Sequence, residues 1–254
     1  MTALTAPLLR EKLFAALIHL TLSVIATGAL ACAMWFALYP PPYFWVDGGW
    51  SVLRTLILVD VILGPMLTFV VFNRAKREWK RDLAIIALVQ IIAFGYGAWT
   101  MGRYRPVFAA YADGVFFAVT WPRVEMATKS IDKPKRMREG RWDPAFVVID
   151  LPADTRALAE LHARANPDGT HALPGMGDLY LPLAGQAAEQ VFKTSADIEV
   201  LAKSDPAVAA ELARVRAGHP GPLNQFAFIP MAGRDDMVMV VFDRASAKPV
   251  DFMR

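Results

Sequence analysis

The sequence contains a single cysteine, Cys32, among 254 residues. One cysteine excludes an internal disulfide and any metal centre built from several thiolates. The four histidines show no pair at metal-ligand spacing, and no Ser-centred nucleophile motif is present. The short GMGD stretch has too few glycines for a phosphate-binding loop. We therefore expect no catalytic residue, no metal and no cofactor.

The first hundred residues lack charge over three long stretches, 13–38, 52–72 and 83–101, whose only charged residues are Arg54 and Asp60. Each stretch meets the length of about 18 apolar residues that marks a transmembrane helix, and none has the polar face of a soluble helix. A cleaved signal peptide is the alternative for the first, but its apolar run is too long. The sequence predicts a short N-terminus (1–12), a three-helix transmembrane domain (13–101) and a second domain (102–254).

Lysine and arginine are absent between the first two stretches and gather between the second and third. The basic residues of this second loop are Arg74, Lys76, Arg77, Lys80 and Arg81. Because such residues favour the cytoplasmic side, we expect the N-terminus in the cytoplasm and residues 102–254 outside it. The aromatic residues of the first loop, Tyr43, Phe44, Trp45 and Trp50, suit the level of the lipid headgroups.

Residues 102–254 carry equal numbers of basic and acidic residues, so the sequence pI near 9.0 comes from the first hundred. A balanced second domain argues against nucleic-acid binding. Its one basic stretch, 129–141, is expected to be a solvated loop, with anionic headgroups as the other possible contact.

The second domain has the pattern of a small α+β fold. Helices are expected over 154–165, 184–192 and 205–217, and short strands over 114–121, 145–152 and 178–183. The final residues alternate apolar runs with the polar segments GRDD and DRASAK, which predicts a C-terminal antiparallel meander. The order of the strands does not follow from the sequence.

The second apolar stretch holds an acid, Asp60, followed one turn later by Gly64 and Pro65. A carboxyl group in hydrocarbon costs roughly 2.5–3.5 kcal/mol even on lenient insertion scales, so it needs a reason to be there. At 1.5 Å per residue, Asp60 lies at the same depth as Thr27 and Tyr96. These groups either satisfy one another within the bundle or receive a polar group from a partner helix.

Two more polar residues lie nearer the cytoplasmic side, at a shared depth where they are able to pair: His19 and Gln90. Proline at position 65 removes a helix hydrogen bond and predicts a kink just below Asp60. Gly64 allows another backbone to approach closely.

The motifs LVDVILGPMLTFVVFN, KREWKRDLAIIALVQ and RPVF, over residues 13–108, resemble the TfpX/TfpZ family of type IV pilin accessory proteins. The resemblance implies a multi-pass protein of the bacterial inner membrane with a periplasmic C-terminal domain and no catalytic activity. It implies a chaperone-like partner of the major type IV pilin before assembly, affecting piliation and twitching motility.

A pilin waits in the membrane as one helix with a charged N-terminus and a nearby glutamate. We expect the transmembrane groove to hold that helix, with Asp60 accepting a hydrogen bond from its amine. The alternatives are a membrane-anchored small-ligand sensor or enzyme with a pocket between residues 166–178 and the meander, or a transporter. The sequence does not indicate the oligomeric state.

Overall fold

The computed structural model describes residues 6–165 and 172–254, which form two compact units. The helical unit runs to Leu38 and resumes over Gly49–Arg103. The head unit combines Tyr39–Gly48 with Tyr104–Arg254. The loop between the first two apolar stretches, which the sequence places in the transmembrane domain, therefore belongs to the head unit.

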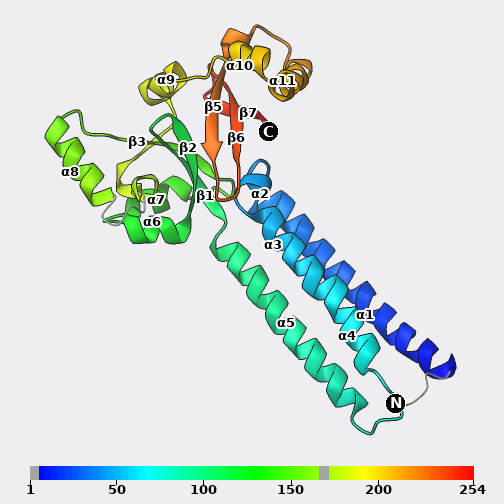
Figure 1. The fold of residues 1–254 in the computed structure, drawn as a ribbon. Helices are drawn as coiled ribbons and strands as arrows, with labels where there is room; N and C mark the ends of the chain where they lie inside the picture. The colour runs from blue at the N-terminus through cyan, green and yellow to red at the C-terminus, as the bar shows by residue number, and fades with distance from the viewer. Residues whose placement is uncertain (1–5, 166–171) are drawn as a thin grey trace. The chain divides into compact units, whose positions relative to one another are not determined.

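Three long spans make up the helical unit and run alongside one another (Figure 1). The first joins α1 (Ala6–Ala33) to a π-helical turn (Met34–Leu38). The second joins α3 (Gly49–Leu56), a π-helical stretch (Ile57–Leu63) and α4 (Gly64–Val71), and the third is α5 (Trp79–Arg103). By length and composition, all three are long and apolar enough to cross a membrane, as the sequence predicts.

The π-helical stretch accommodates the proline at position 65. Proline has no N–H to donate, so the regular helix ladder breaks at this point. Here the N–H of Gly64 donates to the carbonyl of Val59, five residues back, and α4 begins at once with Pro65 in its first turn. A π-helical turn carries an extra residue and is often found at functional sites. It contains Asp60 and buries its side chain.

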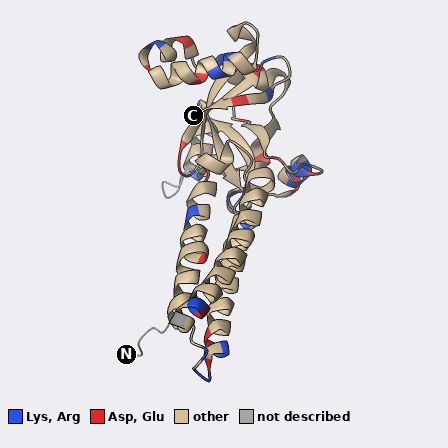
Figure 2. Ribbon diagram, turned by 90° about the vertical axis from the view of Figure 1, so that its right-hand side faces the viewer, with Lys and Arg blue, Asp and Glu red and all other residues tan. Residues whose placement is uncertain are grey.

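One end of the helical unit is basic (Figure 2). Lys12, near the start of α1, donates a 3.0 Å hydrogen bond to the carbonyl of Val70 at the end of α4. Arg74 in the following loop lies 3.8 Å from Glu11. The start of α1 and the basic loop before α5 therefore share the same end.

The head unit is built on a seven-stranded mixed sheet with the order β4-β3-β1-β2-β5-β6-β7. The strands are β1 (Pro106–Ala112), β2 (Val115–Thr120), β3 (Ala145–Ile149), β4 (Tyr180–Pro182), β5 (Phe226–Ala232), β6 (Met237–Asp243) and β7 (Lys248–Met253). Two pairings are parallel, β1 with β3 and β2 with β5. The expected antiparallel meander is present as β5-β6-β7, with its turns at the predicted polar segments.

Two hydrophobic cores hold the helices on this sheet. The first collects side chains of β1 and β3 with α6 (Trp121–Ala127) and α8 (Thr155–Ala165). The second packs β5 and β6 against α10 (Ile198–Ser204) and α11 (Pro206–Gly218). Two further helices of the head unit are α7 (Asp132–Arg138) and α9 (Gly185–Lys193). α7 corrects one expectation, because part of the basic stretch 129–141 is helical rather than loop.

The loop Tyr39–Gly48 is an integral part of the head unit. It contains the single-turn helix α2 (Tyr43–Val46), and Val46 is fully buried. The carbonyl of Val46 accepts hydrogen bonds from the N–H groups of Asp235 and Asp236, in the turn between β5 and β6. Arg254 lies over the ring of Trp45, 4.9 Å from its centroid.

This packing changes the reading of the aromatic loop residues. Tyr43 and Phe44, expected at the level of the headgroups, are buried inside the head unit instead. An aromatic composition suits both a membrane interface and a protein core, so the sequence could not separate the two.

Candidate functional site

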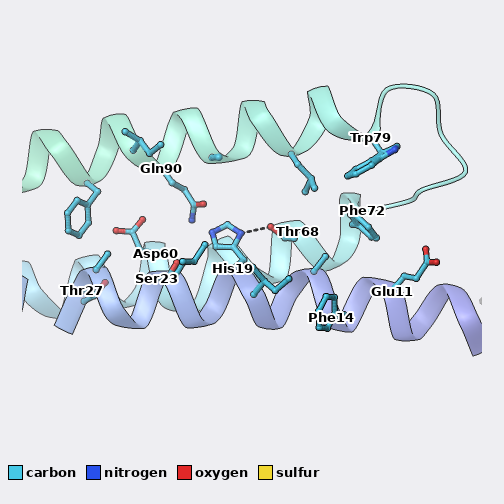
Figure 3. A pocket seen from close by; sticks show the side chains of 18 of the residues that line it. Glu11, Phe14, His19, Ser23, Thr27, Asp60, Thr68, Phe72, Trp79 and Gln90 are labelled. Carbon is cyan, nitrogen blue, oxygen red and sulfur yellow. Dashed lines mark hydrogen bonds between the residues drawn. The ribbon is translucent and has the colours of Figure 1, made fainter. Parts of the chain in front are cut away.

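A cavity of about 840 Å³ lies among the three spans of the helical unit. Its walls come from α1 and α5, and the second span contributes Asp60, Thr68 and Phe72 (Figure 3). The other lining residues are Glu11, Phe14, Ala15, Ile18, His19, Leu22, Ser23, Ala26, Thr27, Arg74, Trp79, Leu83, Ala87, Gln90, Ile91, Phe94 and Gly95. The lining is mostly apolar, with a few polar groups at defined heights, which is the usual composition of a binding site.

The polar groups from α1 form a ladder. His19, Ser23 and Thr27 follow one another at intervals of four residues, so they share one face of the helix. Ser23 and Thr27 are buried, and all three line the cavity. This face of α1 therefore carries a polar side chain at each of three successive turns.

The second span carries the complementary ladder, again at intervals of four residues: Asp60, Gly64 and Thr68. All three are buried. The two ladders meet at Thr68, whose hydroxyl is 2.6 Å from His19 Nδ1. Because α1 and the second span run in opposite directions, the other end of each ladder, Thr27 and Asp60, also comes together (Figure 3).

Asp60 is the unusual group of the site. Its side chain is only 5% exposed, yet it lines the cavity. Among the described residues, neither of its carboxyl oxygens has a hydrogen-bond partner, and the same is true of Thr27 Oγ1. Buried polar groups are nearly always hydrogen-bonded, and leaving one unpaired is costly. The arrangement leaves an acceptor and a hydroxyl free to bind a group that enters the cavity.

The cavity has a closed end and an apolar opening. At the basic end, Phe72 and Trp79 pack edge to face with centroids 5.6 Å apart. Phe14 on α1 and Ile91 on α5 line the cavity while remaining 68% and 69% exposed, so the walls continue outwards as apolar surface. The site is therefore a groove with an apolar rim, and Asp60 lines its interior with both carboxyl oxygens buried.

Most of the residues selected from the sequence lie together. Thr27, Asp60, His19 and Gln90 line the groove, and Gly64 lies against Gln90 and His19. Pro65 is buried at the start of α4. His19 is hydrogen-bonded to Thr68 through Nδ1, and Gln90, which the sequence places at the same depth, lies beside the same glycine as His19 Nε2.

Tyr96 departs from the expected polar layer. Its side chain is 68% exposed, packs beside Trp99 at a centroid distance of 6.0 Å, and does not line the groove. Equal depth along a helix does not fix which way a side chain points, and α5 turns this position outwards. Of the five basic loop residues, Arg74 reaches the groove lining, and Lys80 lies over the ring of Trp79.

Ser23 was not selected from the sequence, and Thr68 was noted only within the motif LVDVILGPMLTFVVFN, not as a site residue. Serine and threonine in apolar helices commonly bond to a carbonyl of their own helix, so neither residue stands out alone. Their spacing is the signal that was available, since each lies four residues from a residue already selected: Ser23 from His19 and Thr27, and Thr68 from Gly64.

Comparison with known proteins finds relatives named for fimbrial assembly. The chain is 37% identical over 92 residues to "Fimbrial assembly protein, serogroup E1" and 36% identical over 92 residues to that of serogroup I, both from Dichelobacter nodosus. Each match covers 35% of this chain and 36% of the relative, so the chain spans about a third of their length.

A third relative, "Fimbrial assembly protein, serogroups C1 and C2" of the same organism, is 36% identical over 92 residues. That match covers 35% of this chain and 70% of the relative. No protein-family model and no solved structure matches the chain.

Proposed function

Because the chain belongs to the family of fimbrial assembly proteins that includes these Dichelobacter nodosus relatives, we propose that it assists the assembly of type IV pili from within the bacterial inner membrane. Its client is the membrane-embedded helix of the major pilin before assembly. The groove between α1 and α5 shelters this helix, and the chain does so without catalysing a reaction.

The observation that carries the proposal is the unpaired carboxyl group of Asp60 in an open, apolar groove. Such a group is expensive in hydrocarbon unless it is partnered. A lipid chain has no donor to offer, whereas a pilin helix carries an amine and other polar groups near its N-terminus. Asp60 therefore accepts a hydrogen bond from the guest helix, and the apolar walls contact the rest of it.

The proposed orientation places the basic end of the helical unit in the cytoplasm. Arg74 and Lys80 lie at that end, and positively charged loops stay on the cytoplasmic side. With three spans, the head unit is then periplasmic, where the globular part of a pilin would be within its reach. Alkaline phosphatase fused after Arg254 should be active, whereas a fusion within the loop 72–78 should be inactive; the reverse pattern would refute the orientation.

The groove is tested by capturing pilin with tagged full-length chain from membranes. Asp60→Leu keeps the span apolar and removes the acceptor, so retained pilin should fall about tenfold, the upper end for one membrane-buried hydrogen bond. Asp60→Asn keeps an acceptor oxygen and should give an intermediate loss.

Thr55→Leu is the matched control. It makes a similar polar-to-leucine change on the same span, where the Thr55 hydroxyl donates a hydrogen bond to the carbonyl of Ser51 in its own helix. Capture by this variant should equal that of the unchanged chain. Undiminished capture by a normally inserted Asp60→Leu chain would remove Asp60 from the partner site.

A further inference from the structure

Gly64 leaves a gap that two polar side chains enter. A Cβ atom built at this position would lie 2.0 Å from Nε2 of Gln90 and 3.1 Å from Nε2 of His19. The amide of Gln90 reaches from α5 towards the imidazole on α1 (Figure 3). The two nitrogens thus converge above the glycine from opposite walls of the groove.

These nitrogens are oriented by the rest of the site. The other ring nitrogen of His19, Nδ1, is engaged by the hydroxyl of Thr68 at 2.6 Å, which leaves Nε2 directed at the gap. A glutamine side-chain amide offers two N–H donors. The gap above Gly64 is therefore a second polar position in the groove. The side-chain amide of Gln90 that lies there favours a hydrogen-bond acceptor on the bound helix.

The two polar positions are one helical turn apart. Gly64 follows Asp60 by four residues, across the π-helical stretch that ends at Leu63. Their preferences are opposite, because a carboxylate accepts hydrogen bonds whereas an amide N–H donates them. A helix lying along the groove meets both positions only with groups three or four residues apart on one face.

We propose that the groove recognises a hydrophobic transmembrane helix carrying a hydrogen-bond donor and an acceptor one turn apart. The donor binds Asp60, and the acceptor, a carboxyl or free carbonyl oxygen, binds Gln90 and His19 above Gly64. This specificity rests on the proposed function, since it assumes that a guest helix occupies the groove. It makes the spacing of polar groups in the guest, rather than its apolarity, the property that is selected.

The test uses the full chain in lipid nanodiscs and three synthetic leucine- and alanine-rich helices with lysines at both ends. One carries Glu and Ser four residues apart, one carries them two residues apart on opposite faces, and one carries neither. Binding is followed by energy transfer between dyes on chain and peptide. The four-residue peptide should bind about tenfold more tightly than the two-residue peptide, as expected for one additional hydrogen bond.

Two variants of the chain probe the second position. Gly64→Ala places a methyl group where the amide of Gln90 lies, and Gln90→Leu removes the donor. Each should abolish the preference for four-residue spacing while the dependence on Asp60 persists. Gly28→Ala is the matched control, because a Cβ on this α1 glycine meets nothing within 4 Å; it should keep the preference.

Equal binding of the two polar peptides, or a spacing preference that survives Gln90→Leu, would overturn this inference. A cross-linker attached at position 91, in the groove wall, should join the chain to the peptide. If it joins two copies of the chain instead, the inference is also overturned. If pilin capture still depends on Asp60, these results leave the proposed function standing. Capture that does not depend on Asp60 would remove Asp60 from the partner site, and failure of the unchanged chain to capture pilin would refute the proposed function itself.

Discussion

Asp47 offers a quantitative test of how the loop Tyr39–Gly48 is held in the head unit. Its carboxyl group is half-buried and accepts a 3.2 Å hydrogen bond from the N–H of Arg234, in the β5–β6 turn. Loss of solvent raises the pKa of Asp47 from 3.8 to about 6, against the opposing effects of the Arg234 hydrogen bond and charge. The nearby Asp235 also raises this pKa.

A raised pKa means that the folded head unit holds the proton more tightly than the unfolded chain. The resulting stabilisation is fully present below pH 3.8 and is lost as the pH rises through about 6. At about 1.4 kcal/mol for each pKa unit, the loss is at most about 3 kcal/mol. Partial exposure reduces the interaction, so we expect about 1–2 kcal/mol.

Asp47→Asn mimics the protonated acid and keeps an oxygen for the N–H of Arg234. Near pH 7.5 the variant should therefore unfold about 2–8 °C above the unchanged chain, since 1 kcal/mol is about 2–4 °C for a unit of this size. At about pH 4 the two should unfold together. The assay is thermal unfolding of full-length protein in detergent, followed by tryptophan fluorescence.

Asp243→Asn is a control of opposite sign. Hydrogen bonds from the Ser246 hydroxyl and backbone N–H lower the pKa of Asp243, so its contribution is present above its unfolded pKa and is lost as the pH falls. That variant should unfold at or below the temperature of the unchanged chain near neutral pH. An Asp47→Asn chain that gains nothing at pH 7.5, or gains equally at pH 4, would refute the assigned burial.

Three further changes have defined outcomes. Gly233→Ala drives a methyl group to 2.2 Å from the carbonyl of Val46 and should destabilise the head unit by about 2 kcal/mol in urea unfolding, whereas Gly218→Ala, with open space around it, should not. Tyr180→Phe removes a buried hydroxyl that donates to the carbonyl of Pro174 and should cost about 1–2 kcal/mol in the same assay. Tyr96→Leu alters an exposed side chain outside the groove and should leave pilin capture unchanged.

The three spans and the C-terminal meander could be predicted because each leaves a periodic or compositional signal. An uninterrupted apolar run identifies a span, and apolar runs separated by polar turns identify β5-β6-β7. β1 was missed because PVFAAYA is apolar throughout and does not alternate. Its parallel pairing with β3 joins segments more than thirty residues apart, which is decided by tertiary packing rather than by local pattern.

The candidate site was likewise predicted from the sequence only in part. Asp60 and the following Gly-Pro pair were conspicuous because they contradict the apolar run around them. Ser23 does not stand out within its apolar run, and Thr68 belongs to the motif LVDVILGPMLTFVVFN without being conspicuous as a site residue, so their place in the site is indicated only by their spacing. The π-helical stretch over Ile57–Leu63 was not predictable in form, since a proline announces a break in the hydrogen-bond ladder but not how the backbone absorbs it.

The incorporation of Tyr39–Gly48 into the head unit has a consequence for biosynthesis. Asp47 leaves the ribosome 187 residues before Arg234, the residue whose N–H it accepts. At about 5–20 residues per second, this loop spends roughly 10–40 s without its partners. The second and third spans are synthesised between this loop and the rest of the head unit. A fragment starting at residue 104 would lack Val46, which packs against Gly233.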